Sequence, residues 1–448
     1  MVVLIACSEN FSDNPGLNQP PKTFVTIFSN NPLNPITSRV TLNWWGDDPD
    51  GIVVGFIYTF DPNAANVQTW SNETPDPDWT FTEKTQETFV LVLSGTDTTY
   101  TLWVKAVDDE GAADIAGAIQ SFSVINSKPI VEFVSSTEVP DTTFTVATFV
   151  WSATDLDGDD TIAMFQYALD DTADESRWRN LDARQTSITL TKEDGLTEGE
   201  HIFFLRAEDV AGAISEIIRM PADENDIWFV REPKSNFLLI DDYNVADNTD
   251  GFMKSTIEAL VGPVDVWDIK RNSGELDPPL VISFTGTLLL FDTIVWYADT
   301  GPNLEKAQVS LPIFIDDGGK ILFTTSFGEF TTNEGDPVLF SPADSLGNRI
   351  SRILKDQVVV PTQFFSAMGF PDLQVGVSII PNIFPLVPKV SAEVMYVLPE
   401  DPSRWPGSPP MAIIDSNAQF AFFSLPVAGL NKMGTVPQLL DKILNELF

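Results

Sequence analysis

Short runs of alternating apolar and polar residues recur through the first half of the chain. Residues 40–44, 89–93 and 100–104 are rich in β-branched and aromatic side chains and are bounded by turn formers. Such alternation is typical of strands that bury one face and expose the other. The pattern therefore predicts antiparallel β-structure, in which every second residue of 100–104 enters a core.

The pattern changes after Pro233, where continuous apolar runs alternate with helical stretches. Continuous apolar strands that alternate with helices indicate a mostly parallel sheet covered on both faces. Asn303 is placed to cap one of the helices, and Gly318 to end it. We expect strands at 237–240, 264–267, 293–297, 320–325, 411–414 and 419–423, and helices at 251–260, 303–315 and 437–448.

The first half contains an internal repeat. Trp44 is followed by Asp48, Asp50 and Gly51, and Trp151 is followed at the same spacing by Asp155, Asp157 and Gly158. The ends of the copies also match, since residues 105–108 (KAVD) correspond to 206–209 (RAED). We interpret these as two copies of one β-module, with the paired tryptophans in the cores.

Four regions follow from these patterns. Residues 1–22 form a leader and tether, 23–126 the first β-module, 127–232 the second, and 233–448 an α/β domain. The proline-rich block at about 331–410 departs from the α/β pattern and is treated as an insertion, serving as a lid or docking surface. The predicted fold class is two all-β sandwiches followed by a three-layer α/β domain.

Each β-module resembles fibronectin type III and related immunoglobulin-like modules. The resemblance is carried by a tryptophan early on a central strand, such as Trp44, and by a closing strand that contains KAVD at 105–108. It implies a sandwich of about 100 residues. The chain has a single cysteine, so neither copy can contain the disulfide of antibody domains.

That cysteine, Cys7, ends the run Leu-Ile-Ala-Cys, which resembles a bacterial lipobox. The resemblance implies a lipid-anchored, extracytoplasmic protein, with residues 1–6 as the end of a signal peptide. Ser8 after the cysteine is typical of sorting to the outer membrane, on its periplasmic or outer surface. Residues 8–22 are polar and rich in Pro and Asn, as in a flexible tether. A chance match in a cytosolic chain is the alternative.

The charge of the chain restricts its partners. A formal net charge of −40 repels nucleic-acid phosphates and anionic lipid. No apolar run reaches the ~20 residues that cross a bilayer, so the lipid is the expected membrane contact. The partners that the charge still allows are a protein or glycan of the cell envelope and divalent cations. The oligomeric state is not indicated.

The Asp-x-Asp-Gly elements have two interpretations. Asp and Gly favour tight interstrand turns. Ca²⁺ is the alternative and the one cofactor that the sequence leaves open, because it binds convergent carboxylate oxygens. The EF-hand pattern is not met, since Asp160 stands at its sixth position and Gln166 at its twelfth. The candidate ligands are Asp155, Asp157, Asp159, Asp160, Asp48 and Asp50. The only histidine, His201, is expected to pack or face solvent.

The second half resembles a divergent class I glutamine amidotransferase-like domain. The resemblance rests on the opening LLIDD at 238–242, the strand DTIVWY at 292–297 and the ending FFSLP at 422–426. In this family a cysteine nucleophile follows a central strand and a histidine acts as base. Here the corresponding turn carries Ser326 and no cysteine, and Leu425 stands near the histidine position. The resemblance therefore implies the fold without the activity.

Carboxylates at the predicted sheet edge are a separate candidate. Asp241 and Asp242 follow a strand, where α/β sheets bind ligands, and Ser326 follows another. They could bind a ligand or act as acid and base. Equally, such aspartates cap helices or face solvent.

The leading hypothesis is a non-enzymatic, lipid-anchored envelope protein that acts as a binding or assembly scaffold. One alternative is an extracytoplasmic hydrolase that uses carboxylates near Asp241 and Asp242. Another is a calcium-dependent adhesion module.

Overall fold

A computed structural model describes residues 17–27, 39–91, 98–124, 126–135, 137, 139–243, 248–270, 280–327 and 335–448. Two compact units divide the chain. The first joins the first β-module to Ala153–Gln166 and Arg206–Glu216, and the second holds Glu132–Ser152, Tyr167–Leu205 and Ile217–Phe448. The second β-module thus contributes residues to both units.

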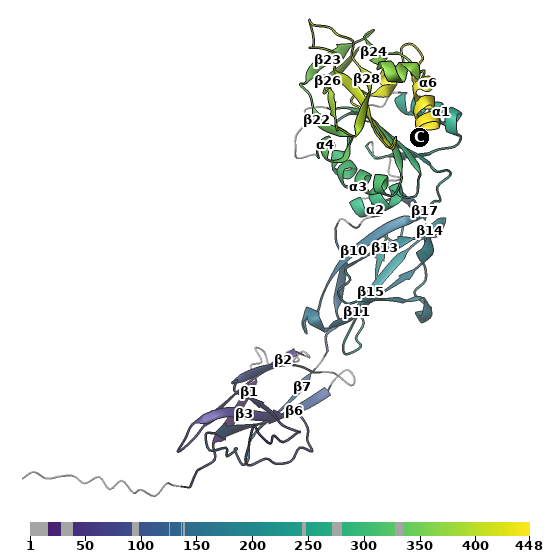
Figure 1. Ribbon diagram of the computed structural model, residues 1–448. Coiled ribbons are helices and arrows are strands. Elements are labelled where there is room, and N and C mark those ends of the chain that lie inside the picture. Colours follow the sequence, from purple (N-terminus) through teal and green to yellow (C-terminus); the bar gives the residue numbers. More distant parts are fainter. Residues whose placement is uncertain are drawn as a thin grey trace, which may run out of the picture. The chain divides into compact units, whose positions relative to one another are not determined.

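The first β-module contains two antiparallel sheets (Figure 1). Their orders are β1-β2-β5 and β4-β3-β6-β7. The strands predicted at 40–44 and 100–104 lie within β2 and β6, whereas the one predicted at 89–93 overlaps only the end of β5, and residues 92 and 93 lie outside the described residues. The bounds are β1 Lys22–Ile27, β2 Arg39–Asp47, β3 Val53–Thr59, β4 Thr80–Thr82, β5 Gln86–Val90, β6 Thr98–Asp108 and β7 Ala118–Val124.

The two sheets of the first module share one core. Leu42 and Trp44 of β2 and Leu102 and Val104 of β6 belong to a single buried cluster. Because β2 and β6 lie in different sheets, the module is a β-sandwich. The opposite face of β6 is not left to solvent as predicted, because Trp103 there contacts a second small cluster that includes buried Trp79.

The second β-module is built in the same way. Its sheets are β13-β10-β8 and β12-β11-β15-β16, with a third small sheet β14-β17-β9. Phe149 of β10 stacks on Phe203 of β15 with ring centroids 3.8 Å apart, which joins the two larger sheets. Trp151 is fully buried like Trp44, as the repeat predicted. The bounds are β8 Ile130–Phe133, β9 Thr142–Thr143, β10 Val146–Thr154, η1 Asp159–Thr161, β11 Ile162–Leu169, η2 Glu175–Arg177, β12 Arg179–Asp182, β13 Ser187–Thr191, η3 Lys192–Asp194, β14 Gly199–His201, β15 Phe203–Asp209, β16 Ile218–Met220 and β17 Trp228–Val230.

Residues after 233 are organised around a nine-stranded sheet of order β19-β18-β20-β21-β30-β29-β28-β24-β25. The strands from β19 to β30 in this order pair in parallel, and those from β30 to β25 pair antiparallel. All six predicted strands are present. The bounds are β18 Phe237–Asp242, β19 Asp265–Asp268, β20 Thr293–Thr300, β21 Lys320–Ser326, β24 Val358–Pro361, β25 Leu373–Gln374, β28 Ala392–Val397, β29 Pro410–Asp415 and β30 Phe420–Phe423.

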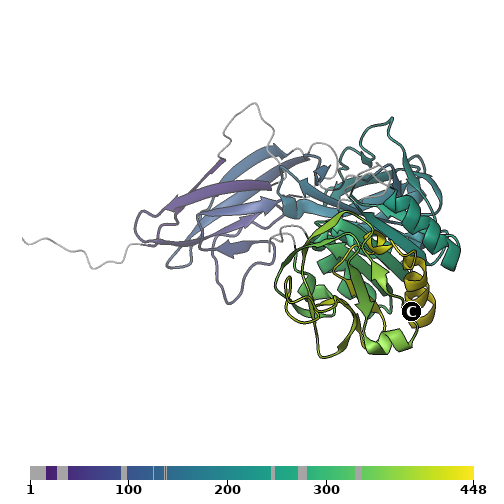
Figure 2. The ribbon, with the colours of Figure 1, turned by 90° about the horizontal axis from the view of Figure 1, so that it is seen from above.

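Helices pack against this sheet in two groups (Figure 1). Alternate residues of β18 enter two different clusters, Leu239 with α1 and α6, and Ile240 with α2 and α3. Figure 2 shows the closing helix, in yellow, beside the green strands. Asn303 caps α3 as predicted, accepting a hydrogen bond from the Lys306 amide at 3.2 Å. The bounds are α1 Thr249–Val261, α2 Val281–Leu288, α3 Leu304–Asp316, α4 Pro337–Phe340, α5 Gln363–Ala367, η4 Val427–Leu430, α6 Val436–Asp441 and a final π-helical turn, η5, at Lys442–Leu447.

The block at about 331–410, taken from sequence as an insertion, extends the sheet. Its strands β24, β25 and β28 are the last three in the sheet order, beside β29. Two further antiparallel pairs, β22 with β27 and β23 with β26, form separate two-stranded sheets within the block. Their bounds are β22 Ala343–Leu346, β23 Ile350–Leu354, β26 Ile379–Ile383 and β27 Leu386–Pro388.

Within the second compact unit, Phe144 connects the β-module to the domain that follows it. Its ring meets Trp267 and Phe291 edge to face, with centroids 6.3 Å and 5.3 Å away. The Arg231 guanidinium lies 4.5 Å over the same ring and 3.5 Å from the Asp265 carboxylate. Across all the described residues, no helix has the length and apolar character of a membrane span.

Candidate functional site

The first Asp-x-Asp-Gly turn links β2 to β3 in module one. Asp48 accepts a hydrogen bond from the Asp50 amide through Oδ1 at 3.3 Å, which shapes the turn. Asp50 accepts one from the backbone amide of Gln19, at 3.1 Å to Oδ2. Gly51 leaves room for two carboxylates here, because a Cβ would stand 2.7 Å from Asp109 Oδ1 and 2.9 Å from Asp48 Oδ2. Both carboxylate oxygens therefore crowd one point.

The second turn repeats this arrangement between β10 and β11. Asp155 Oδ1 accepts from the Asp157 amide at 2.8 Å. Asp157 Oδ2 accepts from both the amide and the hydroxyl of Ser127, at 2.9 Å and 2.7 Å. Ser127 precedes β8, the first strand of the second module, as Gln19 precedes β1 of the first. Each turn is thus tied to the segment that enters its own module.

A third aspartate completes each network, at the end of the closing strand. Asp209 Oδ1 accepts from the amides of Ala211 and Ala213 at 2.9 Å and 2.8 Å. Its Oδ2 accepts from the side-chain amide of Asn126 at 2.5 Å. Asp108 repeats this pattern in the first module. Its Oδ1 accepts hydrogen bonds from the amides of Glu110 and Ala112, and its Oδ2 accepts one from the Asn18 side-chain amide at 2.8 Å.

One carboxylate oxygen in each network has no hydrogen-bond partner. Asp48 Oδ2 and Asp155 Oδ2 are both shielded from solvent and unpartnered. The whole Asp155 residue is only 8% exposed. Burial raises the pKa of the Asp155 carboxyl, and the neighbouring carboxylates of Asp157, Asp209 and Asp159 raise it further. A buried anionic oxygen without a donor is costly unless something positive reaches it.

The other two predicted ligands of the second module already have partners in the protein. Asp159 Oδ1 accepts from the Asp155 amide at 3.0 Å, and Asp160 forms an ion pair with Arg39. Arg39 also donates to the Asp157 carbonyl at 2.7 Å. No three His, Cys, Asp or Glu side chains in the described part of the chain are gathered as a ready-made metal cage. The calcium prediction stays a prediction.

Sequence reasoning missed four members of these networks that come from the entering segments. They are Asn18, Gln19, Asn126 and Ser127. No motif marks them, although Asp108 and Asp209 were visible as matched ends of the repeat. The corresponding asparagines are separated from their aspartates by about 80 to 90 residues, so only folding brings them together.

The predicted pair at the edge of the second-half sheet is buried. Asp241 accepts from the Tyr243 amide at 3.1 Å. Asp242 Oδ2 accepts from the Asn303 amide at 2.6 Å and from the Trp296 indole at 3.0 Å, while its Oδ1 lies 3.4 Å from Lys270 Nζ. These contacts join β18 to β20 and to the start of α3.

The environment of Asp242 sets its protonation. Burial raises its pKa to about 6, although Lys270 and the two donors act in the opposite direction. Ser326 is likewise enclosed, and its hydroxyl donates to the Asp299 carbonyl at 2.6 Å. The structure thus places all three candidates of this edge inside the fold. Cys7, the predicted lipidation site, lies outside the described residues.

Comparison with protein-family models gives no match, and neither does comparison with curated proteins. The fibronectin(III)-like modules of Clostridium thermocellum CbhA are 16% identical, with 47% of this chain and 95% of that chain covered, at a TM-score of 0.19. The PKD1 domain of Vibrio anguillarum Epp is 16% identical, with 25% of this chain and 99% of that chain covered, at a TM-score of 0.16. The chicken CNTN1 FN1-FN3 domains are 10% identical, with 49% of this chain and 68% of that chain covered, at a TM-score of 0.20. At such TM-scores the sandwich architecture follows from the strand pairing and shared cores above, not from these similarities.

Proposed function

We propose that this protein is a non-enzymatic scaffold of the bacterial cell envelope whose two β-modules each bind a divalent cation at the Asp-x-Asp-Gly turn. The observation that carries the proposal is the pair of buried, unpartnered oxygens, Asp48 Oδ2 and Asp155 Oδ2, at equivalent positions of the repeat. A single such oxygen has many explanations. Two at matched positions, each within the same hydrogen-bond network, point to a common ligand.

Calcium suits the available donors best. Hard cations prefer oxygen ligands, and Ca²⁺ accepts six to eight of them in flexible geometry from carboxylates, amides, carbonyls and water. Around Asp155 stand the carboxylates of Asp157, Asp159 and Asp209, and the Asn126 amide is bonded to one of them. A bound cation would also offset the repulsion among these charges.

The cation would stiffen the entry to each module. Asn126 and Ser127 precede the first strand of module two and already bond to Asp209 and Asp157. A cation bound at Asp155 would offset the repulsion among the carboxylates that hold this segment. The turn should therefore open less readily when the cation is bound. A stiff entry is useful in a spacer that presents a folded domain at a distance.

Three finer assignments belong to this proposal. Cys7 carries the lipid that anchors the chain to the outer membrane, on its periplasmic or outer surface. The β-modules are of fibronectin type III or immunoglobulin-like type. The domain after residue 233 is a three-layer α/β domain of amidotransferase-like type, supported by its run of parallel strands and its two helix groups.

We assign recognition rather than catalysis to the last domain. The region 233–448 has no cysteine and no histidine. Asp241 and Asp242, which a carboxylate hydrolase would use, are at most 1% exposed. A general acid or base must reach its substrate. A protein or glycan of the envelope is the expected partner.

Calcium titration tests the proposal. Calorimetry on the EGTA-stripped protein should give two sites per chain. Asp155→Asn and Asp48→Asn should each lose one, and the double variant both. At 100 times Kd, one site adds about 2.7 kcal/mol to stability. Asp344→Asn, an exposed aspartate on β22, is the matched control. Unchanged stoichiometry in the double variant, or no heat with the wild type, contradicts the proposal.

A further inference from the structure

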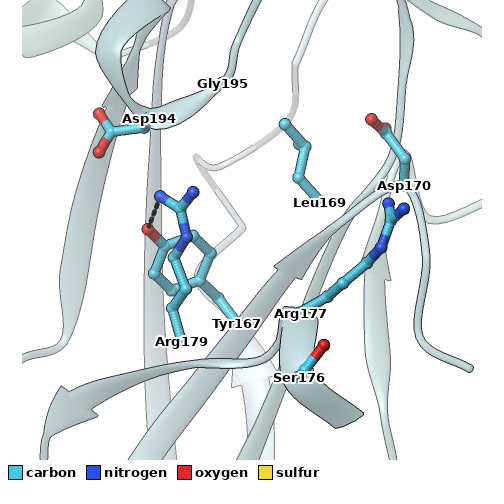
Figure 3. A pocket seen from close by; sticks show the side chains of 8 residues that line it. All are labelled: Tyr167, Leu169, Asp170, Ser176, Arg177, Arg179, Asp194 and Gly195. Atoms are coloured by element: carbon cyan, nitrogen blue, oxygen red, sulfur yellow. Dashed lines mark hydrogen bonds between the residues drawn. The ribbon is translucent and has the colours of Figure 1, made fainter. Parts of the chain in front are cut away.

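A hollow on the second β-module is lined by two arginines. Its volume is about 400 Å³, which is within the range of small-ligand pockets. Figure 3 shows it from close by, with Tyr167 and Arg179 on one side and Arg177 and Asp170 on the other. The lining residues are Tyr167, Leu169, Asp170, Ser176, Arg177, Arg179, Asp194 and Gly195. None of them belongs to the proposed cation networks.

The local sequence puts both guanidinium groups into the same hollow. Arg177 ends η2 and Arg179 begins β12, and Trp178 between them is buried in the module. Trp178 points inward, whereas the arginines on either side of it are exposed and both line the hollow. Two cations at this spacing stand out in a chain with 25 basic and 65 acidic residues.

Tyr167 lines the hollow together with residues that are mostly polar, and its own ring is held by packing. Tyr167 is buried and its ring stacks on Phe203 at 5.8 Å. Arg179 lies 5.9 Å above the Tyr167 ring and donates Nη1 to the Tyr167 hydroxyl at 3.3 Å. This contact orients a guanidinium that has five donor hydrogens and uses one of them here.

The acidic side chains of the hollow are engaged with the protein. Asp170 accepts from the His201 ring at 3.0 Å and from the Ile202 amide at 2.9 Å. Asp194 accepts from the Thr191 amide and hydroxyl at 2.9 Å and 3.0 Å, within a capping box that fixes η3. Arg177 has a 3.4 Å ion pair with Asp171 in which both side chains are exposed, so it exchanges readily with another anion.

We infer that this hollow binds a small monocarboxylate that carries an apolar or aromatic body. Arg179 would hold the carboxylate, because the guanidinium fork matches its planar geometry, and Arg177 on the other side of the hollow would add positive charge. The body would lie along Leu169, because Tyr167 is buried and its ring already contacts Phe203 and Arg179. The net charge of −40 disfavours ligands with several negative charges, which selects a monocarboxylate over a dianionic phosphate. This inference does not depend on the cation proposal.

Titration of the full chain with 3-phenylpropionate, followed by calorimetry and ligand-observed NMR, tests the assignment. We expect saturable binding that weakens as salt is raised, and no binding of the neutral 3-phenylpropionamide. Arg179→Gln and Arg177→Gln should each weaken binding about tenfold or more, whereas Arg179→Lys should recover part of the loss. The control is Arg184→Gln, an exposed arginine of the same module that does not line the hollow.

Several outcomes overturn the assignment. They are absence of 3-phenylpropionate binding at about 10 mM, equal binding of the amide, and equal losses in Arg179→Gln and Arg184→Gln. Tighter binding of phenylphosphate than of the carboxylate overturns the choice of ligand class. Both arginine variants change exposed side chains, so thermal melting should stay at the wild-type value and separate lost binding from lost folding.

Discussion

Asp48 and Asp155 occupy equivalent positions in the two β-modules, and each leaves the same carboxylate oxygen, Oδ2, buried and without a hydrogen-bond partner. Their other oxygen accepts from the amide two residues later in both cases. The equivalence extends to the entering segments and to the closing strands. A feature that costs free energy and recurs in both copies calls for a shared cause, and a bound cation supplies one.

The first prediction concerns Asp155 without calcium. Asp155→Asn should stabilise the EGTA-treated protein by about 1 kcal/mol, because it removes a buried charge among other carboxylates and adds a donor beside them. In the presence of calcium the wild type should instead be more stable than Asp155→Asn. Thermal melting in EGTA and in calcium measures both. Destabilisation in both conditions would show that Asp155 serves the turn alone.

The second prediction concerns the pH dependence of calcium binding. Burial and neighbouring carboxylates raise the pKa of Asp155, and the protonated form cannot bind a cation. Calcium affinity should therefore fall as the pH drops towards that raised pKa, at a higher pH than for an ordinary aspartate. Calorimetry from pH 7 to pH 4 tests this, with Asp48→Asn isolating the second-module site. A flat profile over this range would count against Asp155 as a ligand.

Asp242 should make stability depend on pH in the opposite sense to most carboxylates. Its folded-state pKa is raised to about 6, above the unfolded value of about 3.9. The folded state therefore binds the proton more tightly, and the stability from this group is full below about pH 4 and lost as the pH rises through about 6. Urea unfolding between pH 4 and pH 7 should show this decline in the wild type. Asp242→Asn should flatten it, and curves of equal slope would refute the assignment.

Phe144 should matter more than any nearby surface aromatic. It is 1% exposed and contacts Trp267, Phe291 and Arg231. Phe144→Ala should cost about 3–5 kcal/mol by leaving a cavity, whereas the exposed Phe364→Ala should cost under about 0.5 kcal/mol. Urea unfolding followed by tryptophan fluorescence measures both. Equal effects would show that the Phe144 contact contributes little.

The lipid anchor can be tested in producing cells. Because Cys7 is the only cysteine, Cys7→Ser should abolish labelling by an alkyne fatty acid and release the protein from membranes. Ser8→Ala should keep the label. Label that persists in Cys7→Ser would place the lipid elsewhere or reject lipidation.

Sequence patterns predicted local elements well where one physical signal dominated. Alternation located β2 and β6, and the Asn303 cap located the start of α3. The patterns failed where the deciding contact is remote. Alternation implied that one face of β6 is left to solvent, yet Trp103, on the face opposite the main core, packs against a cluster that contains Trp79. The 331–410 block lacked a repeating pattern, and it joins the sheet because β28 pairs with β29 and is followed by β24 and β25.

By itself the amino-acid sequence determined that the first half is a tandem repeat, that thiol chemistry is absent after residue 7, and that the chain is strongly acidic. These properties follow from composition and residue spacing alone, without the three-dimensional structure. Tertiary structure alone decided which aspartates matter. Asp242 is enclosed by Trp296, Lys270 and the start of α3, Asp160 faces Arg39, and Asp155 is left with an unpartnered oxygen. Burial and donor count depend on residues far apart in the chain, so adjacent aspartates that look alike in sequence end in different electrostatic environments.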